Sequence, residues 1–350
     1  MTCLMIDVEG LGLINSDIER IKHPLVGGII LFARNYKNRP QLIKLIISIR
    51  KIKQNLLIAV DHEGGRVQRF KDEFTNIPKM SLFGKIYQKD RDRANKIAKL
   101  SGWVIAEELA AIDIDFSFTP VLDVDYGASS VIGDRAFHQD IDTISELASS
   151  LVEGLDFGGM QSVGKHFPGH GFIKSDTHLE TATDNRSLET IQKNDMLTFD
   201  RLIQKGVKGI MPSHVVYSSC DHSPAGLSGF WLQDQLRDRL GFEGAIFSDD
   251  MSMQAAQDSE NNITLRVKRA LIAGCDMVLV CNSPIELDKL MGELQWKPDV
   301  KSLERLQLMK LNRDKNNLTC CNHNIDEARS IIAQVSVSYT HLTLPTIYSV

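Results

Sequence analysis

Short apolar segments recur along the chain, separated by stretches with the mixed polarity of surface helices. Eight such segments can be recognised, at positions 4–8, 28–32, 56–61, 116–120, 161–166, 209–214, 244–249 and 277–281. Several are almost continuously apolar, which is typical of parallel strands that helices cover on both faces. The pattern therefore predicts an α/β fold in which strands and helices alternate.

The stretches between these strands carry apolar residues at helical spacing. Two clear faces are Leu42, Leu45, Ile46 and Ile49, and Ile144, Leu147, Leu151 and Leu155. Eight strand–helix units are the number that closes a (β/α)₈ barrel. The rival arrangement, an open doubly wound sheet, would normally have a GxGxxG or GxxxxGKS/T loop after its first strand, and neither is present. We therefore predict a (β/α)₈ TIM-like barrel.

The organisation of the chain indicates one domain. Its 350 residues contain no linker rich in Pro, Gly or Ser. We assign residues 1–336 to the barrel with a C-terminal helical segment. Residues 337–350 change abruptly to Thr, aromatic and β-branched residues without Asp, Glu, Lys or Arg, and their VSYTHL run resembles a translated sequencing adaptor. Our hypothesis is that this tail is a non-native appendage or disordered.

Composition narrows the function classes. Lys plus Arg number 40 and Asp plus Glu 45, and no basic cluster suggests a nucleic-acid or anionic-membrane partner. Asp7 and Glu9 stand where a signal peptide would be apolar, and no apolar run approaches the roughly 18 residues of a membrane span. The six cysteines lack CxxC spacing and are expected to be reduced thiols. We therefore expect a cytoplasmic, soluble protein. The sequence does not determine its oligomeric state, and a monomer is the expectation.

Polar residues cluster directly after several of the predicted strands. In a barrel, catalytic side chains project from the carboxyl ends of the strands and the loops that follow. The clusters here are at 61–69, 123–125 with 133–135, 165–171, 213–214 and 248–250. We therefore expect these side chains to converge on one site.

The densest cluster is KHFPGHGFIKSDTH, from Lys165 to His178. In one interpretation, Lys165 and His166 donate hydrogen bonds to ligand hydroxyls while Asp176 orients His178 for proton transfer. In a second, His166, His170, Asp176 and His178 bind a divalent metal, although the Pro-Gly step disfavours the helical presentation common in such sites. In a third, the histidines only form hydrogen bonds within the loop.

Two further motifs each allow two interpretations. In Ser248-Asp249-Asp250 a carboxylate at a strand end is a candidate nucleophile, while Ser and Asp also favour the N-cap of a following helix. Both can hold, one for each aspartate. The motif DHEGGRVQR, at 61–69, either brings charged side chains over the barrel mouth through its paired glycines or forms a turn with surface salt bridges.

Taken together, the motifs resemble the single-domain β-N-acetylhexosaminidases of glycoside hydrolase family 3. The resemblance rests on DHEGGRVQRF, GDRAF, KHFPGHG followed by Asp-x-His, and GAIFSDDMSM, and it extends from about residue 4 to 281. It implies a (β/α)₈ barrel without metal or cofactor that removes terminal β-linked N-acetylglucosamine. It also implies recycling of cell-wall fragments in the cytosol, with N-acetylglucosaminyl-anhydro-N-acetylmuramyl peptides as substrates.

Carried over by position, the resemblance makes Asp249 the nucleophile and His178 the acid/base, with Asp176 as its partner. The positions that match the family's sugar-binding residues are Asp61, Arg69, Arg135, Lys165 and His166. The sequence departs from the family at His62, Phe172-Ile173 and Met251, and the first two departures are expected to alter contacts beyond the terminal sugar.

The mechanism that follows is a retaining one. Asp249 would form a covalent glycosyl ester, while a histidine of pKa near 6.5 would protonate the leaving oxygen and then deprotonate water. Attack by the substrate's own acetamido carbonyl is the alternative mechanism. The alternative functions are a metal-dependent hydrolase and a non-catalytic sugar-binding barrel.

Overall fold

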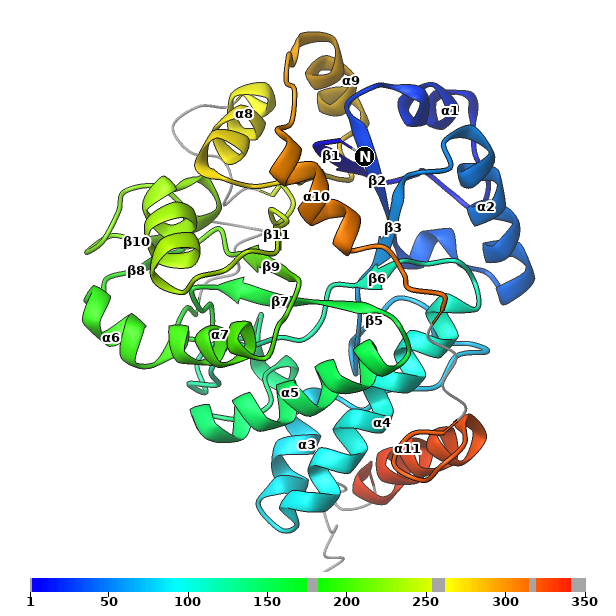
Figure 1. The fold of residues 1–350 in the computed structure, drawn as a ribbon, viewed down its shortest axis with the longest axis vertical. Coiled ribbons are helices and arrows are strands. Elements are labelled where there is room, and N and C mark those ends of the chain that lie inside the picture. Colours follow the sequence, from blue (N-terminus) through cyan, green and yellow to red (C-terminus); the bar gives the residue numbers. More distant parts are fainter. Residues whose placement is uncertain (1, 175–181, 254–261, 315–318, 341–350) are drawn as a thin grey trace, which may run out of the picture.

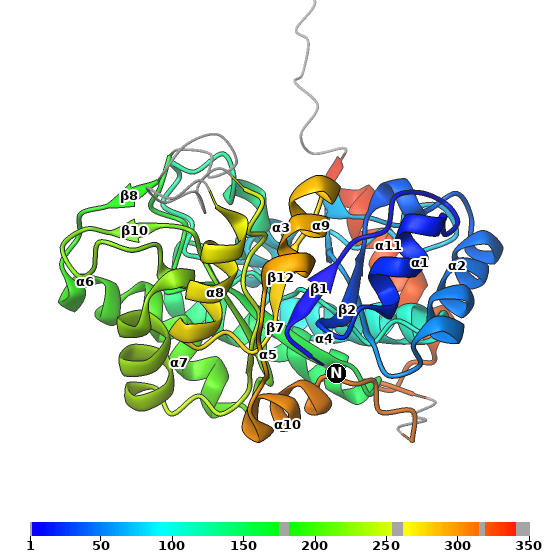
Figure 2. The same ribbon diagram turned by 90° about the horizontal axis from the view of Figure 1, so that it is seen from above.

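The computed structural model describes residues 2–174, 182–253, 262–314 and 319–340, with side chains up to residue 335 (Figure 1). Strands and helices alternate along the chain, and helices lie around a central parallel sheet. Figure 2 shows α2 (Arg39–Ile52) and α7 (Asp195–Gln204) on opposite sides of the strands. The expected α/β fold is therefore present.

The central sheet has eight strands in the order β11-β9-β7-β6-β3-β2-β1-β12, and its strand pairs are parallel. Their bounds are β1 Leu4–Ile6, β2 Val26–Leu31, β3 Leu57–Val60, β6 Phe116–Ser117, β7 Gln161–Phe167, β9 Gly209–Pro212, β11 Ala245–Ile246 and β12 Val278–Val280. Each of the eight predicted segments overlaps one of these strands, which confirms the pattern of apolar segments. Several strands are shorter than predicted, β6 and β11 most of all.

The sheet is curled. Its first and last strands, β11 and β12, are joined by a parallel bridge between Phe247 and Met277. The Ser248 N–H donates to the Met277 carbonyl at 2.9 Å, and the Asp276 N–H donates to the Ile246 carbonyl at 2.8 Å. The two ends of the strand order therefore meet.

The helices follow the strands. Beside α2 and α7 they are α1 Asn15–Lys22, α3 Met80–Tyr87, α4 Arg91–Ala110, α5 Ile141–Phe157, α6 Leu188–Lys193, α8 Ile263–Ala273, α9 Pro284–Glu293, α10 Val300–Leu308 and α11 Ile325–Thr340. Short helical segments are η1 Ala33–Asn35, η2 Gly133–Arg135, η3 Ala225–Leu227 and the π-helical η4 Phe230–Arg239. Two small strand pairs lie outside the sheet, β4 His62–Gly64 with β5 Val67–Gln68, and β8 Thr183–Asp184 with β10 Val216–Tyr217.

Helices α4 and α5 pack closer than side chains would allow. A Cβ atom on Gly102 would lie 2.0 Å from the Leu151 carbonyl oxygen, and one on Gly154 would lie 2.0 Å from that of Lys99. Each glycine therefore packs directly against the backbone of the other helix. Because atoms cannot overlap in this way, larger residues at either position would push the helices apart.

The C-terminal part is helical, as expected for residues up to about 335. Helix α11 continues to Thr340, past the predicted boundary at residue 336, and contacts α4. Residues 341–350 lie outside the described ranges, so the hypothesis of a non-native tail stays a prediction. Among the described residues, no helix is both long and apolar enough to span a membrane.

Candidate active site

A cavity of about 740 Å³ opens beyond the carboxyl ends of the central strands. Six of the predicted site residues are described, and all six line it: Asp61, Arg69, Arg135, Lys165, His166 and Asp249. One wall contains Phe118, whose ring centre lies 5.2 Å from that of Phe116 and 5.7 Å from that of Phe247. The expected convergence of the strand ends is therefore confirmed, on top of a buried aromatic cluster.

The hairpin of β4 and β5 returns the chain to the end of β3. Gly64 and Gly65 turn it with φ of 116° and 56°, a region that glycine tolerates and other residues rarely adopt. A Cβ on Gly64 would lie 2.6 Å from the Pro78 carbonyl oxygen. As a result, Arg69 reaches Asp61, with 2.9 Å between Nη2 and Oδ2. The motif therefore brings charged side chains into the cavity, and its Arg66 also forms an exposed ion pair with Asp134, as the alternative interpretation expected.

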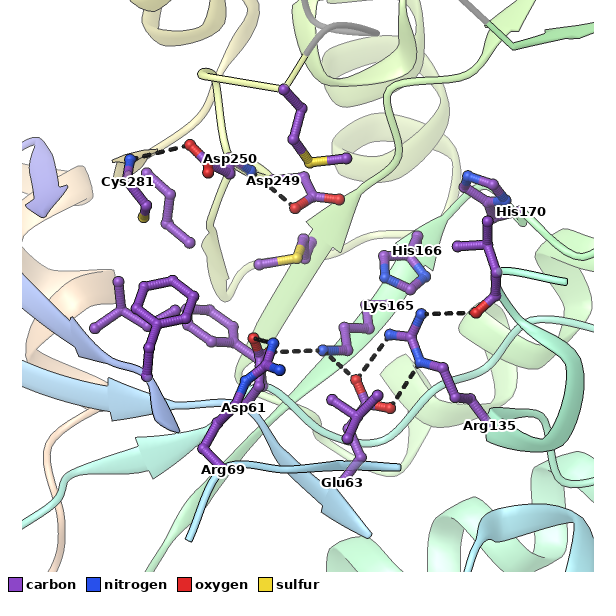
Figure 3. A pocket seen from close by; sticks show the side chains of 18 of the residues that line it. Asp61, Glu63, Arg69, Arg135, Lys165, His166, His170, Asp249, Asp250 and Cys281 are labelled. Atoms are coloured by element: carbon purple, nitrogen blue, oxygen red, sulfur yellow. Dashed lines mark hydrogen bonds and ion pairs between the residues drawn. The ribbon is translucent and has the colours of Figure 1, made fainter. Parts of the chain in front are cut away.

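A network of five charged side chains forms one side of the cavity (Figure 3). Lys165 Nζ lies 3.0 Å from Asp61 Oδ1 and 2.6 Å from Glu63 Oε1. Arg135 holds both oxygens of Glu63, at 2.8 and 2.9 Å. Lys165, Arg69 and Arg135 are three cations facing two carboxylates, so one positive charge remains uncompensated within the network.

Both carboxylates of this network are ionised because of their neighbours. Burial raises the pKa of Asp61, but the charges of Lys165 and Arg69 outweigh it and hold this pKa well below its usual range. Burial likewise disfavours ionised Glu63, yet Arg135 and Lys165 lower its pKa to about 2. Glu63 was not among the predicted site residues. Its position two residues after Asp61, in the same charged motif, was the available signal.

We expect Lys165→Met to destabilise the protein by about 3–5 kcal/mol at neutral pH, because it leaves Asp61 and Glu63 buried without the cation they share. Urea unfolding at several pH values would measure this loss. The wild-type carboxylates, with lowered pKa, contribute stability above pH about 4 that is lost as the pH falls. The deficit of the variant should therefore shrink towards acidic pH.

The matched control is Lys193→Met in α6, which removes the exposed ion pair between Lys193 and Glu189, one helical turn apart. It should cost at most about 0.5 kcal/mol. A Lys165→Met variant no less stable than this control would contradict the assigned role of the lysine in holding the two carboxylates.

His166 is oriented by the buried carboxylate of Asp123. The sequence indicated that this residue follows a predicted strand, but no role was assigned to it. The His166 Nδ1–H donates to Asp123 Oδ2 at 2.7 Å, and the backbone N–H groups of His166 and His170 donate to Asp123 Oδ1 at 3.2 and 2.7 Å. Burial raises the pKa of the Asp123 carboxyl group. The interaction with His166 outweighs burial and brings this pKa below its usual value. Asp123 therefore fixes both the ring of His166 and the loop that follows β7.

The two adjacent aspartates after β11 have different environments. Asp249 lines the cavity, and its Oδ1 accepts the Asp250 N–H at 2.8 Å. Burial opposes its ionisation, but His214, His166 and Lys165 among others bring its pKa below the usual value. In Figure 3 it lies across the cavity from Asp61 and Glu63.

Asp250 instead ties its loop to β12. Its Oδ1 accepts the N–H groups of Ser252 and Cys281, each at 3.0 Å, and burial raises its pKa to about 6. It therefore does not cap a regular helix: residues 251–253 form a turn, and α8 begins at Ile263 with Asn262 as its N-cap. A turn therefore takes the place of the expected helix cap at Asp250, and the nucleophilic role of Asp249 stays a prediction.

His214, which follows β9, forms a hydrogen bond to the loop that contains Asp249 and Asp250. Its Nε2–H donates to the Asp250 carbonyl oxygen at 3.0 Å, and the side chain is fully buried. Burial lowers its pKa, while the nearby charge of Asp249 opposes this shift. The sequence showed His214 at a strand end but gave no signal for this contact.

The remaining predicted site residues, Asp176 and His178, lie outside the described residues. The described chain ends at Lys174 and resumes at Ala182. Among the described residues, no group of three or more His, Cys, Asp or Glu side chains is placed to hold a metal ion. Of the proposed metal ligands, His166 is engaged by Asp123, and burial lowers the pKa of His170 to about 4.

One expected departure from the family does not reach the cavity. His62 is buried between Phe70 and Phe74, with ring centres at 6.1 and 5.9 Å, and burial lowers its pKa to about 3. It does not line the cavity, and its expected effect on contacts beyond the terminal sugar stays a prediction. Its β-strand position turns it to the apolar side of the hairpin. Phe172 is exposed, and its expected effect on substrate contacts stays a prediction.

The charged cavity lies at the carboxyl ends of a curled parallel sheet, which is where enzymes with this kind of α/β architecture have their active sites. Residues 5–305 match the family described as Glycosyl hydrolase family 3 N terminal domain. The chain belongs to glycosyl hydrolase family 3.

Individual relatives agree with this assignment. A β-hexosaminidase of Methylobacillus flagellatus is 52% identical over 324 residues, which are 92% of this chain and 93% of that protein. A β-hexosaminidase of Nitrosomonas eutropha is 51% identical over 308 residues, 88% of each chain. The crystal structure of NagZ from Neisseria gonorrhoeae in complex with N-trifluoroacetyl-D-glucosamine has a TM-score of 0.88 and 40% identity, covering 95% of this chain and 97% of that one.

Proposed function

We propose that this glycoside hydrolase is a retaining exo-β-N-acetylglucosaminidase. The activity of a β-N-acetylhexosaminidase is supported by the names of relatives about 50% identical over most of their length. The similar NagZ structure holds an N-acylated glucosamine, which supports N-acetylglucosamine as the terminal sugar. The observation that carries the proposal is Asp249, a partly buried carboxylate of lowered pKa that lines the cavity across from the charged network.

The charged network binds the sugar. Asp61, Lys165 and Arg69 present acceptors and donors side by side, which suits the adjacent hydroxyl groups of a sugar ring. Because each side chain is already held by a neighbour, little conformational entropy is lost when the sugar binds. Arg135 and His166 complete the set of expected sugar contacts and line the same cavity.

Asp249 attacks the anomeric carbon from the other side of the cavity. Its carboxylate oxygen forms the new bond while the bond to the leaving oxygen breaks, and that oxygen takes a proton from His178. His178, oriented by Asp176, then accepts a proton from water as the water oxygen displaces Asp249 and restores the enzyme. The two residues of this proton-transfer pair are assigned from sequence resemblance.

Closure of the sheet and the number of domains belong to the same proposal. The bridge between Phe247 and Met277 supports a closed (β/α)₈ barrel, and the main core cluster, which extends from Cys3 to Val335, supports one domain for residues 1–336. In this arrangement, one barrel supplies all the residues of the site.

The natural substrate and setting follow from the family resemblance. We infer that the enzyme acts in the cytoplasm, as a monomer, on N-acetylglucosaminyl-anhydro-N-acetylmuramyl peptides from the cell wall. An acidic chain without a basic cluster supports a small glycan rather than a nucleic-acid partner.

The test compares 4-nitrophenyl β-glycosides of N-acetylglucosamine, N-acetylgalactosamine and glucose. We expect efficient release from the first and much weaker release from the glucoside, which lacks the acetamido group. Equal turnover of the glucoside would contradict N-acetylhexosamine specificity. Binding of N-acetylglucosamine without turnover of any substrate would instead favour the sugar-binding barrel.

We expect exhaustive chelation to leave turnover unchanged, because a side chain is available for each chemical role in the mechanism. Rates before and after treatment with a chelator, at pH 7, measure this. Loss of activity that zinc or manganese restores would favour the metal-dependent hydrolase.

A further inference from the structure

A side pocket of about 320 Å³ adjoins the cavity of the candidate active site. Asn282 lines both the cavity and the side pocket, so the two meet at this residue. The side pocket is also lined by Asp7, Glu9 and Arg34. Asp7 follows β1, Arg34 lies in η1 after β2, and Asn282 follows β12. Since β2, β1 and β12 are neighbours in the sheet, the side pocket lies at the same carboxyl edge as the cavity.

Asn282 is held in one orientation by two neighbours. Its backbone N–H donates to Asp7 Oδ2 at 3.0 Å, and Arg34 Nη1 donates to its Oδ1 at 2.8 Å. Arg34 also forms an ion pair with Asp7. Asn282 has a φ of 57°, a left-handed conformation that asparagine adopts more readily than most residues. Because arginine can only donate, the amide oxygen faces Arg34 and the amide nitrogen points away from it.

The amide nitrogen of Asn282 is an unused hydrogen-bond donor. Within the described part of the chain, no residue accepts a hydrogen bond from this Nδ2. Asn282 is exposed, as are two further residues that line the cavity, Arg66 and Ser130. Arg66 is already engaged, since it pairs with Asp134 and donates to the Ser130 carbonyl oxygen. Asn282 therefore presents a fixed and available donor at the mouth of the cavity.

Asn282 lies next to the loop of the proposed nucleophile. Asp250, which follows Asp249, accepts the N–H of Cys281 on its Oδ1 at 3.0 Å (Figure 3). Cys281 directly precedes Asn282. In the proposed mechanism Asp249 attacks the anomeric carbon, so the bond to the leaving group is at this end of the terminal sugar. The leaving group therefore begins on the side of the cavity where the side pocket opens.

We propose that the side pocket binds the leaving-group saccharide, the unit next to the scissile bond, and that Asn282 Nδ2 donates a hydrogen bond to it. This inference rests on the proposed function, because it needs a terminal sugar held by the charged network. The walls of the side pocket carry both charges, with Asp7 and Glu9 beside Arg34, and they suit the hydroxyl groups of a sugar. Asn282 binds the leaving group and takes no part in bond breaking.

The test compares two substrates with the same terminal sugar. In N,N′-diacetylchitobiose the leaving group is a sugar, whereas in methyl β-N-acetylglucosaminide it is too small to fill the side pocket. The measured quantity is the ratio of kcat/KM for the disaccharide to kcat/KM for the methyl glycoside. Asn282→Gly should lower this ratio about three- to tenfold, mainly through a higher KM for the disaccharide, because one hydrogen bond is lost. Glycine tolerates the left-handed backbone, so the loop should keep its conformation.

Two further variants separate the donor from the rest of the side chain. Asn282→Asp keeps the shape and an oxygen for Arg34 but replaces the donor by an acceptor, so the ratio should fall at least as far as in Asn282→Gly. Arg34→Met should lower the ratio more weakly, since the amide remains but is free to turn. The matched control is Asn322→Gly, the same substitution at an exposed asparagine with a φ of 64°, and it should leave the ratio unchanged.

A ratio that stays at the wild-type value in both Asn282 variants would overturn this role while leaving the proposed function intact, whether both activities are retained or fall equally. A wild-type ratio in Asn282→Asp alone would also contradict it, because the donor would then be dispensable. Cleavage of neither substrate by the wild-type protein would instead refute the proposed function, and with it the binding of a leaving group in the side pocket.

Discussion

Replacing Asp249 by asparagine is expected to lower kcat by about 10³-fold or more on every β-N-acetylglucosaminide, since the other carboxylate on that side of the cavity, Asp250, is engaged by the N–H groups of Ser252 and Cys281. The substitution keeps the shape of the side chain and one oxygen to accept the Asp250 N–H. The fold should therefore persist, and unfolding in urea would verify this. Steady-state kinetics with 4-nitrophenyl β-N-acetylglucosaminide measures the loss.

Asp250→Asn is the matched comparison, because it changes the adjacent residue that ties the loop to Ser252 and Cys281. It should weaken the loop without removing the nucleophile. A 5-fluoro glycosyl inhibitor should label Asp249 covalently in the wild type and in Asp250→Asn, as mass spectrometry of the peptide would show. A label on Asp250, or inversion at the anomeric carbon, would refute the assignment.

Replacing His178 by alanine is expected to have the second largest effect, and one that depends on the leaving group. Hydrolysis of a disaccharide, whose leaving oxygen needs a proton, should fall by about 10²–10⁴-fold. Formation of the glycosyl ester from a nitrophenyl glycoside should suffer far less. Its hydrolysis should then limit the rate, because the base that activates water is gone. A burst of nitrophenol and a lowered KM should follow, measurable by stopped-flow absorbance.

Asp176→Ala should show the same pattern more weakly, because a partner that orients the imidazole is lost while the imidazole stays. His222→Ala, at an exposed position outside the cavity, is the control and should behave like the wild type. If His178→Ala loses the same factor on both substrates, the histidine binds sugar or supports its loop, and the acid/base lies elsewhere.

The fold could be predicted because its strands and helices have different periodicities. The runs at 28–32 and 161–166 correspond to β2 and β7, which are buried along almost their whole length in the structure. The strand ends were harder to place. Phe247 and Ser248, for example, were predicted to lie in a strand. In the structure they follow β11 and form single hydrogen bonds to neighbouring segments instead of a regular ladder.

The site could be predicted in part because parallel strands end at the same edge of a sheet. This alone brings Asp61, Lys165 and Asp249 together from positions nearly two hundred residues apart. The supporting residues could not be found in this way. His214 and Asp123 act through a backbone carbonyl and backbone N–H groups, and such contacts depend on the exact path of the loops.

The two sides of the cavity are stabilised by different forces. On one side, β6 precedes Asp123 and β7 contains Lys165. Behind these strands, the glycines of α4 and α5 bring the two helix backbones into direct contact, so a displacement there must move both helices at once. Behind Asp249 the strand has two residues, and the loop depends on the hydrogen bonds of Asp250 and His214. A new position for the proposed nucleophile therefore requires the exchange of a few hydrogen bonds, while a new position for the proposed sugar site requires repacking of the outer helices. In evolutionary terms, the proposed chemistry is easier to change in this fold than the sugar that it is proposed to recognise.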